Sequence, residues 1–200
     1  MHDGRNTPST NTNSRPNNSK SLGYDYIDVM LHPVERNSWK SLAVGAIGRL
    51  FGFDVRAVHC SLKISLSLYD DEQQPQHVVI HDFTDEGVQS TSEITRPVLG
   101  YVRLYLDPEL DVKYIDEVLE RISDSHDRGD KLNWFEGWNV VRRGETKTLV
   151  CTNWVLSMLG MGDEYMTPLT LADHVYRFAN RAIPSCVGAY KSASLKERPL

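Results

Sequence analysis

The clearest hydrophobic pattern in the chain is a strict alternation between residues 58 and 68. Apolar side chains stand at every second position from Val58 to Leu68, and mostly polar side chains fill the positions between them. A period of two is that of a β-strand with one buried face and one open face. Cys60 falls on the buried side and is expected to be structural, whereas His59 falls on the open side.

A second strand is predicted over residues 76–83, after a turn rich in acidic residues. If the hairpin turns about Asp70, His81 lies directly opposite His59, and both point to the open face. A shift of one residue would place the polar side of one strand on the core side of the other, so it is disfavoured. The pattern therefore predicts two imidazoles that share one accessible site.

The remaining periodicities predict further elements around this hairpin. Aromatic and β-branched residues at 24–31 and 98–106 are typical of strands, and a Gly-Val pair at 87–88 begins another short extended piece. Apolar residues at spacings of three and four predict helices over 38–50 and 111–123, and a last helix capped by Thr170. No such pattern follows residue 184, so Cys186 and the C-terminus are expected to be peripheral. The predicted fold class is α+β.

The stretch from residue 149 to 160 is predicted to be a buried helix with a cysteine in its first turn. Apolar residues recur at helical spacing, Thr148 is a candidate N-cap, and Gly160 can end the helix. Cys151 would then lie among the free N–H groups of the first turn, where the helix dipole favours the nucleophilic thiolate. On this stretch alone, the alternative of an inert core cysteine is favoured.

Composition narrows the class of protein. The 200 residues are 40% hydrophobic and 24% charged, which fits one globular domain with a tail. A formal net charge of −5 argues against nucleic-acid binding, because phosphates need a basic face. No run of about 18 apolar residues and no apolar leader occur, so neither a transmembrane segment nor secretion is expected. Three cysteines without zinc-finger spacing fit free thiols in a reducing compartment, the cytoplasm.

Three segments are predicted along the chain. Residues 1–22 are rich in Asn, Ser, Thr and Pro and are expected to form a disordered tail. Residues 23–185 form the predicted domain, and residues 186–200 form a C-terminal tail. The domain contains an aromatic cluster that is either a hydrophobic plug, which is favoured, or part of a substrate wall: Trp134, Phe135 and Trp138.

The order of these motifs resembles that of the circularly permuted NlpC/P60 papain-like group, which is related to the lecithin:retinol acyltransferase-like proteins. Ordinary papain-like enzymes place the cysteine helix before the histidine strand, and the permuted group places the histidine first. The matching segments, within about residues 24–180, are His59-Cys60-Ser61-Leu62-Lys63-Ile64, Val79-Ile80-His81-Asp82 with Gly87-Val88, Cys151-Thr152-Asn153-Trp154-Val155, and Thr167-Pro168. The chain departs from the group in three ways. Ser61 stands where the group usually has glycine, and the hairpin is longer than usual. The Asn-Cys-Glu-His sequence of the acyltransferase branch is absent.

The resemblance implies a permuted papain-like fold, with an antiparallel sheet packed against the cysteine-bearing helix. It also implies a thiol hydrolase that forms an acyl-enzyme and needs no metal or organic cofactor. The substrate would be a peptide, another amide, or an acyl ester or thioester. The alternatives are a catalytically silent papain-like module for binding or structure, and an unrelated α+β module.

The resemblance assigns three catalytic roles. Cys151 is the nucleophile, and its backbone N–H supplies part of an oxyanion hole. His59 is the general base and later the general acid. His81 is the third member, which orients His59, and His77 and Asp82 are the fallbacks. Asp82 ranks lower because it alternates to the core face in the predicted register.

Overall fold

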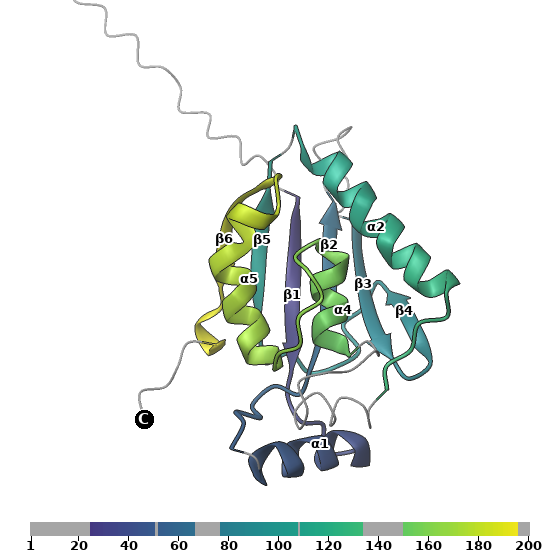
Figure 1. Cartoon of the computed structure of the whole chain (residues 1–200), viewed down its shortest axis with the longest axis vertical. Helices are drawn as coiled ribbons and strands as arrows, with labels where there is room; N and C mark the ends of the chain where they lie inside the picture. Colours follow the sequence, from purple (N-terminus) through teal and green to yellow (C-terminus); the bar gives the residue numbers. More distant parts are fainter. Residues whose placement is uncertain (1–24, 51, 67–76, 108, 134–149, 196–200) are drawn as a thin grey trace, which may run out of the picture.

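The computed structural model describes residues 25–50, 52–66, 77–107, 109–133 and 150–195. Within these ranges, a six-stranded antiparallel sheet carries three helices on one side, and a fourth helix lies at one end of the sheet (Figure 1). The α+β class is therefore confirmed. The predicted N-terminal tail and the aromatic cluster near residue 135 lie outside the described residues.

The strands follow the order β4-β3-β2-β1-β5-β6 across the sheet. Their bounds are β1 Tyr26–His32, β2 His59–Leu66, β3 His77–Thr84, β4 Gly87–Thr91, β5 Gly100–Leu106 and β6 Cys186–Lys191. The helices are α1 Trp39–Leu50, α2 Asp111–Asp127, α4 Cys151–Met158 and α5 Pro168–Ala182, followed by the short 3-10 helix η1 Ala193–Leu195. The two central strands are thus β2, which carries His59, and its neighbour β1.

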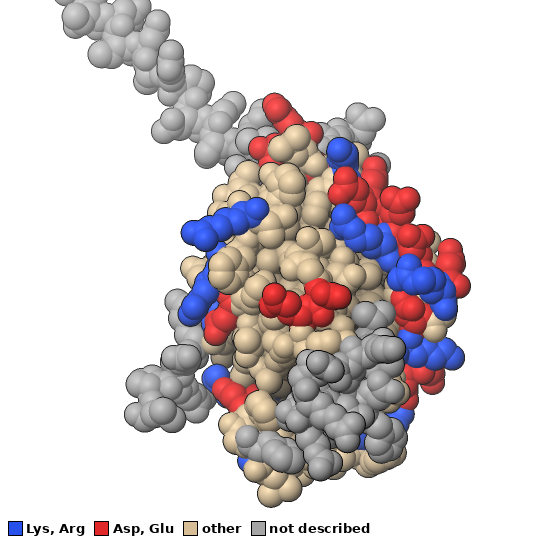
Figure 2. Space-filling model, in the orientation of Figure 1, with Lys and Arg blue, Asp and Glu red and all other residues tan. Residues whose placement is uncertain are grey.

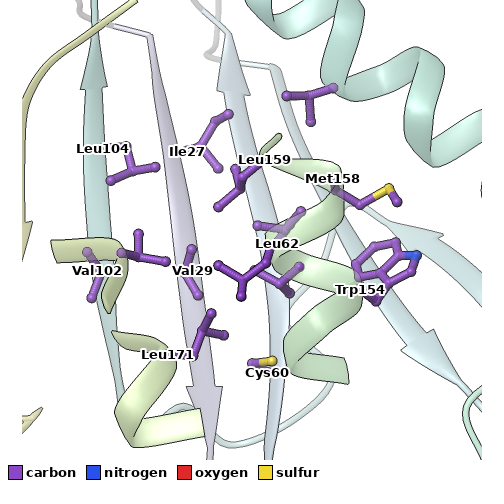
Figure 3. Packing of buried hydrophobic residues seen from close by; sticks show 14 of the residues in the cluster. Ile27, Val29, Cys60, Leu62, Val102, Leu104, Trp154, Met158, Leu159 and Leu171 are labelled. Carbon is purple, nitrogen blue, oxygen red and sulfur yellow. The ribbon is translucent and has the colours of Figure 1, made fainter. Parts of the chain in front are cut away.

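One face of the sheet packs against α2, α4 and α5 and is almost wholly apolar. Its side chains come from alternate positions of the three central strands, and all are at most 2% exposed: Ile27, Val29, Leu31, Cys60, Leu62, Ile64, Val102, Leu104 and Leu106. Figure 3 shows several of them pointing toward α4 and α5. The prediction that Cys60 points into the core is confirmed.

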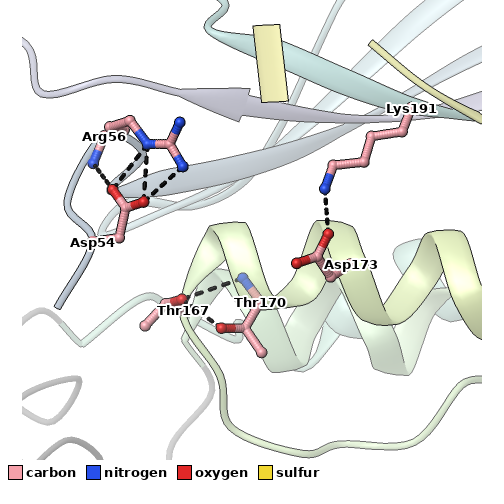
Figure 4. A network of polar contacts seen from close by, with 6 residues as sticks. All are labelled: Asp54, Arg56, Thr167, Thr170, Asp173 and Lys191. Carbon is pink, nitrogen blue, oxygen red and sulfur yellow. Dashed lines mark hydrogen bonds and ion pairs between the residues drawn. The ribbon is translucent and has the colours of Figure 1, made fainter. Parts of the chain in front are cut away.

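The C-terminal segment joins the sheet, so the prediction that the chain beyond residue 185 is a tail is wrong for residues 186–195. β6 pairs with β5, and Lys191 forms an ion pair with Asp173 on α5 (Figure 4). The cap of α5 also differs from the prediction: Thr167, rather than Thr170, is the N-cap, and its side chain accepts from the Thr170 N–H at 3.3 Å. Pro168 then occupies the first helical turn, where its missing N–H costs nothing.

The surface on the helix side carries its charges unevenly. Figure 2 shows Lys, Arg, Asp and Glu side chains interspersed over α2, whereas the surface around α5 and α4 is mostly uncharged. No helix in the described ranges has the length and apolar character needed to cross a membrane.

Candidate active site

Cys151 is the first residue of α4, as predicted. Val150 is the N-cap, and its backbone N–H donates to the side-chain oxygen of Asn153 at 2.7 Å. The predicted cap, Thr148, lies outside the described residues. Cys151 is 8% exposed, and nearly every other residue of α4 is buried. The predicted buried helix with a cysteine in its first turn is therefore confirmed.

Aromatic packing fixes α4 against the sheet. The rings of Trp154 and Phe83 stack with centroids 5.3 Å apart and an interplanar angle of 8°. The indole N–H of Trp154 donates to the hydroxyl of Ser125 on α2 at 3.0 Å. Gly160, with a φ of 69°, ends the helical stretch in a conformation that a side chain would disfavour. These contacts hold α4 against β3 and α2, and Cys60 of β2 lies beside the start of α4 (Figure 3).

His59 is the first residue of β2 and lies opposite His32 on β1. It is 3% exposed, so the prediction that it stands on an open strand face is wrong. Polar side chains near His59 on this face bond to one another and to the carbonyl oxygen of Pro97. The sequence pattern of this strand face is polar, but around His59 the face is buried and its polar groups are hydrogen-bonded.

Asp82 contacts the Nε2 edge of the His59 ring. Nε2 of His59 and Oδ1 of Asp82 are 2.5 Å apart, and Nε of Arg96 lies 3.3 Å from the other carboxylate oxygen. Burial alone would raise the pKa of Asp82, but the hydrogen bond and charge of His59 and the charge of Arg96 keep that pKa below its usual value. Asp82 is therefore an ionised acceptor, and Nε2 of His59 donates to it.

His81 does not reach His59, and the predicted pairing of the two histidines is wrong. In the hairpin, His81 lies opposite Leu62 and Asp82 lies opposite Ser61, which turns His81 to the helix side of the sheet. Its Nδ1 lies 2.9 Å from the Ser90 hydroxyl, and burial lowers its pKa.

Phe83 explains why the predicted register fails. The observed register is three residues away from the predicted one, an odd shift that exchanges the faces of β3. It places Phe83, which is 0% exposed, against Trp154 in the core. The other fallback, His77, pairs with Leu66 at the opposite end of β2 from His59.

His32 on β1, held by a hydrogen bond to Ser61 on β2, lies beside His59. His32 Nδ1 lies 2.9 Å from the carbonyl oxygen of Pro97, so this nitrogen carries the proton. Its Nε2 then accepts from the Ser61 hydroxyl at 2.7 Å. Burial and the neighbouring charge of His59 lower the pKa of His32. A neutral His32 thus lies beside the His59 ring, with centroids 5.7 Å apart.

The sulfur of Cys151 has Cys60 and His59 as its polar neighbours. It lies close to the thiol and the backbone N–H of Cys60, and close enough to the His59 imidazole for the two charges to interact. The Cys60 thiol and the charge of His59 hold the pKa of Cys151 well below its ordinary value, although burial opposes the shift. The shift favours the thiolate form of this cysteine, which is the nucleophilic one.

His59 is the matching cation. Burial alone lowers the pKa of His59, but the Cys151 charge and the hydrogen bond to Asp82 outweigh it and raise the pKa to about 9. The two side chains form a buried thiolate–imidazolium pair, with Asp82 behind the imidazolium. Sequence reasoning identified Cys151 and His59, but it ranked Asp82 low because it placed that residue on the wrong face.

A pocket of about 320 Å³ opens beside Cys151. Its walls come from α1, the segment after α1, the start of α4 and the segment before α5. Most of the residues around it are apolar: Val44, Gly48, Phe53, Val55, Ala57, Val58, Leu132, Val150, Met166 and Pro168. Cys60 does not line this pocket in the described residues, so the pocket reaches the site from the Cys151 side.

The described residues hold no group of three or more His, Cys, Asp and Glu side chains arranged to bind a metal ion. No protein-family model matches the chain, and no curated protein or solved structure matches it significantly. The resemblance to the permuted papain-like group therefore stays a prediction, which rests on the order of the motifs.

Proposed function

We propose that the protein is a cysteine-dependent hydrolase of permuted papain-like architecture, with Cys151 as nucleophile, His59 as general acid and base, and Asp82 as the residue that orients His59. The observation that carries this proposal is the buried grouping of Cys151, His59 and Asp82, in which His59 interacts through charge with Cys151 and its Nε2 lies 2.5 Å from the Asp82 carboxylate. A thiolate paired with an imidazolium is the activated form of a cysteine nucleophile.

The reaction follows from which atom each group presents. The Cys151 thiolate attacks a carbonyl carbon, and the N–H groups in the first turn of α4 stabilise the oxygen that becomes negative. Since Nε2 of His59 donates to Asp82, the proton for the leaving group comes from Nδ1. In the second half, neutral His59 takes a proton from water, which attacks the acyl-enzyme and releases Cys151.

The apolar pocket beside Cys151 favours a substrate whose acyl part is apolar. Its volume of about 320 Å³ fits a bulky hydrophobic side chain or a medium-length acyl chain. An amide, an ester and a thioester would all form the same acyl-enzyme with Cys151. The chain order also supports the permuted architecture, because the strand bearing His59 precedes the strand bearing Asp82 and then the helix bearing Cys151.

Alkylation by iodoacetamide tests the proposal, with Cys186 as an internal control. The two thiols are almost equally buried, 8% exposed for Cys151 and 7% for Cys186. Burial raises the pKa of Cys186, whereas the environment of Cys151 lowers the pKa of that thiol. We expect Cys151 to be alkylated much faster than Cys186 near neutral pH, and His59→Ala to abolish most of the difference.

A screen of chromogenic esters and peptide amides with apolar acyl groups then tests turnover. We expect activity that Cys151→Ala removes completely. Rapid alkylation of Cys151 without turnover of any substrate would instead favour the silent binding module. Equal, slow alkylation of Cys151 and Cys186 would contradict an activated nucleophile altogether.

A further inference from the structure

Cys60 is a buried thiol that the proposed hydrolysis does not consume. It follows His59 in β2 and points to the helix side of the sheet, next to the first turn of α4 (Figure 3). Its side chain is 0% exposed, and its thiol and that of Cys151 each shift the pKa of the other. Because Cys151 is the first residue of α4, the two thiols lie close together although the residues are far apart in the sequence.

The two thiols differ in both ionisation and access. Burial and the neighbouring Cys151 raise the pKa of Cys60 well above its ordinary value, so Cys60 stays a protonated thiol while Cys151 is a thiolate. The pocket reaches Cys151 but is not lined by Cys60 in the described residues. A small oxidant entering through the pocket meets the thiolate first, and thiolates are the form of cysteine that peroxides oxidise.

We propose that Cys60 is the resolving thiol of Cys151, and that hydroperoxides convert the pair reversibly into a Cys60–Cys151 disulfide. In the first step, the Cys151 thiolate attacks the peroxide, the O–O bond breaks, the neighbouring His59 imidazolium protonates the leaving oxygen, and a sulfenic acid and one molecule of water or alcohol form. In the second step, the Cys60 sulfur attacks the sulfenic sulfur, and its proton leaves with the hydroxyl as water. The two cysteines together lose two electrons, and a dithiol restores them.

The disulfide would switch off the site and protect it. It would remove the nucleophile and tie the first turn of α4 to β2, next to His59. It would also compete with further oxidation of the sulfenic acid to sulfinic acid, which is irreversible without a dedicated repair enzyme. The loss of activity rests on the proposed function, whereas formation of the disulfide does not.

Peptide mapping of the full chain under non-reducing conditions tests this. The reduced protein is treated with hydrogen peroxide, its free thiols are blocked, and the cross-linked peptides are identified by mass spectrometry. We expect a Cys60–Cys151 disulfide that dithiothreitol reverses, in the wild type and equally in Cys186→Ser. Cys186 is a suitable control because it lies on β6, three strands away from β2.

Cys60→Ala supplies the second measurement. Without a resolving thiol, we expect irreversible oxidation of Cys151 to sulfinic acid to increase on the order of tenfold. A wild-type protein that forms no Cys60–Cys151 cross-link, or pairs Cys186 instead, would overturn the proposal whether or not the variant folds. A reversible cross-link in a protein that hydrolyses no substrate would leave the redox proposal standing and count against the hydrolase.

Discussion

Both faces of the central sheet carry buried side chains, but different forces hold them in place. On the helix side, aliphatic side chains from three strands pack against α4 and α5 with almost no polar atom among them. On the other side, charged and polar residues are buried to a similar degree: Asp28, His32 and His59 at 3% exposed and Ser61 at 1%. Each of the first three has a specific polar partner, such as the bidentate pair of Arg103 with Asp28 at 2.8 and 2.9 Å.

The difference between the faces explains how the candidate site is built. Apolar packing is non-directional, so it fixes the depth and position of α4. Hydrogen bonds are directional, so the polar face fixes the angle of the His59 ring through Asp82. Cys151 comes from the helix side and His59 is the first residue of β2, and the two lie together where that strand begins. The candidate site therefore depends on both faces of the sheet, and substitutions can disrupt the packing of one face without changing the other.

The largest effect on stability is expected on the helix side. Trp154 is 0% exposed, stacks on Phe83 and bonds to Ser125, so Trp154→Ala removes a large buried ring and leaves a cavity. We expect the free energy of unfolding in urea to fall by about 3–5 kcal/mol.

Trp39 on α1 is the matched control, because it is 67% exposed. Trp39→Ala should change the free energy of unfolding by no more than about 0.5 kcal/mol. A similar loss of stability in the two variants would mean that α4 is not held by its contact with the sheet.

The next largest effect is expected on activity, and it comes from comparing substitutions at two adjacent residues of β3 whose side chains point to opposite faces of the sheet. Asp82→Ala removes the acceptor that orients His59, and we expect kcat/KM for the best substrate to fall on the order of 10²-fold or more. His81→Ala removes a residue that bonds to Ser90, so activity should stay within a few-fold of wild type. The same order is expected for the rate of Cys151 alkylation, which does not need a substrate. If His81→Ala were the more damaging change, the observed register of the hairpin could not be the active one.

The parts of the fold that follow from local pattern were predictable. The alternation of β2 and the helical spacing around Cys151 each depend on neighbours within one element, and both elements form where they were predicted. β6 was missed because it is a short strand at the edge of the sheet, and its buried and exposed residues do not alternate. Its place is fixed by pairing with β5, which lies far away in the sequence.

The site was only half predictable for the same reason. Cys151 and His59 stand out by residue type and by their position at the start of an element. Whether His81 or Asp82 faces His59 depends on the pairing of β3 with β2, and the burial of Phe83 against Trp154 is consistent with the pairing found. That stacking joins residues from two distant segments, so no local pattern reports it. The closeness of Cys60 to Cys151 likewise depends on where α4 packs on the sheet.

The smallest effect is a shift in the pH dependence, and it tests the polar face alone. The pKa of His59 is raised to about 9, so the imidazolium is present below that pH and is lost as the pH rises through it. Hydrolysis by the wild type should therefore decline above pH about 9, because the leaving group loses its acid. Asp82→Asn keeps the shape of the side chain but removes its charge, which lowers the pKa of His59.

We expect the alkaline limb of the kcat/KM profile to move to lower pH in Asp82→Asn, by about one pH unit. The alkaline limb should lie at the same pH in the wild type and in His81→Ala, because His81 does not contact the His59 ring. An alkaline limb that stays in place in Asp82→Asn would assign it to a group other than His59. In that case the carboxylate on the polar face would serve to hold β3 against β2 and not to set the charge of the imidazole.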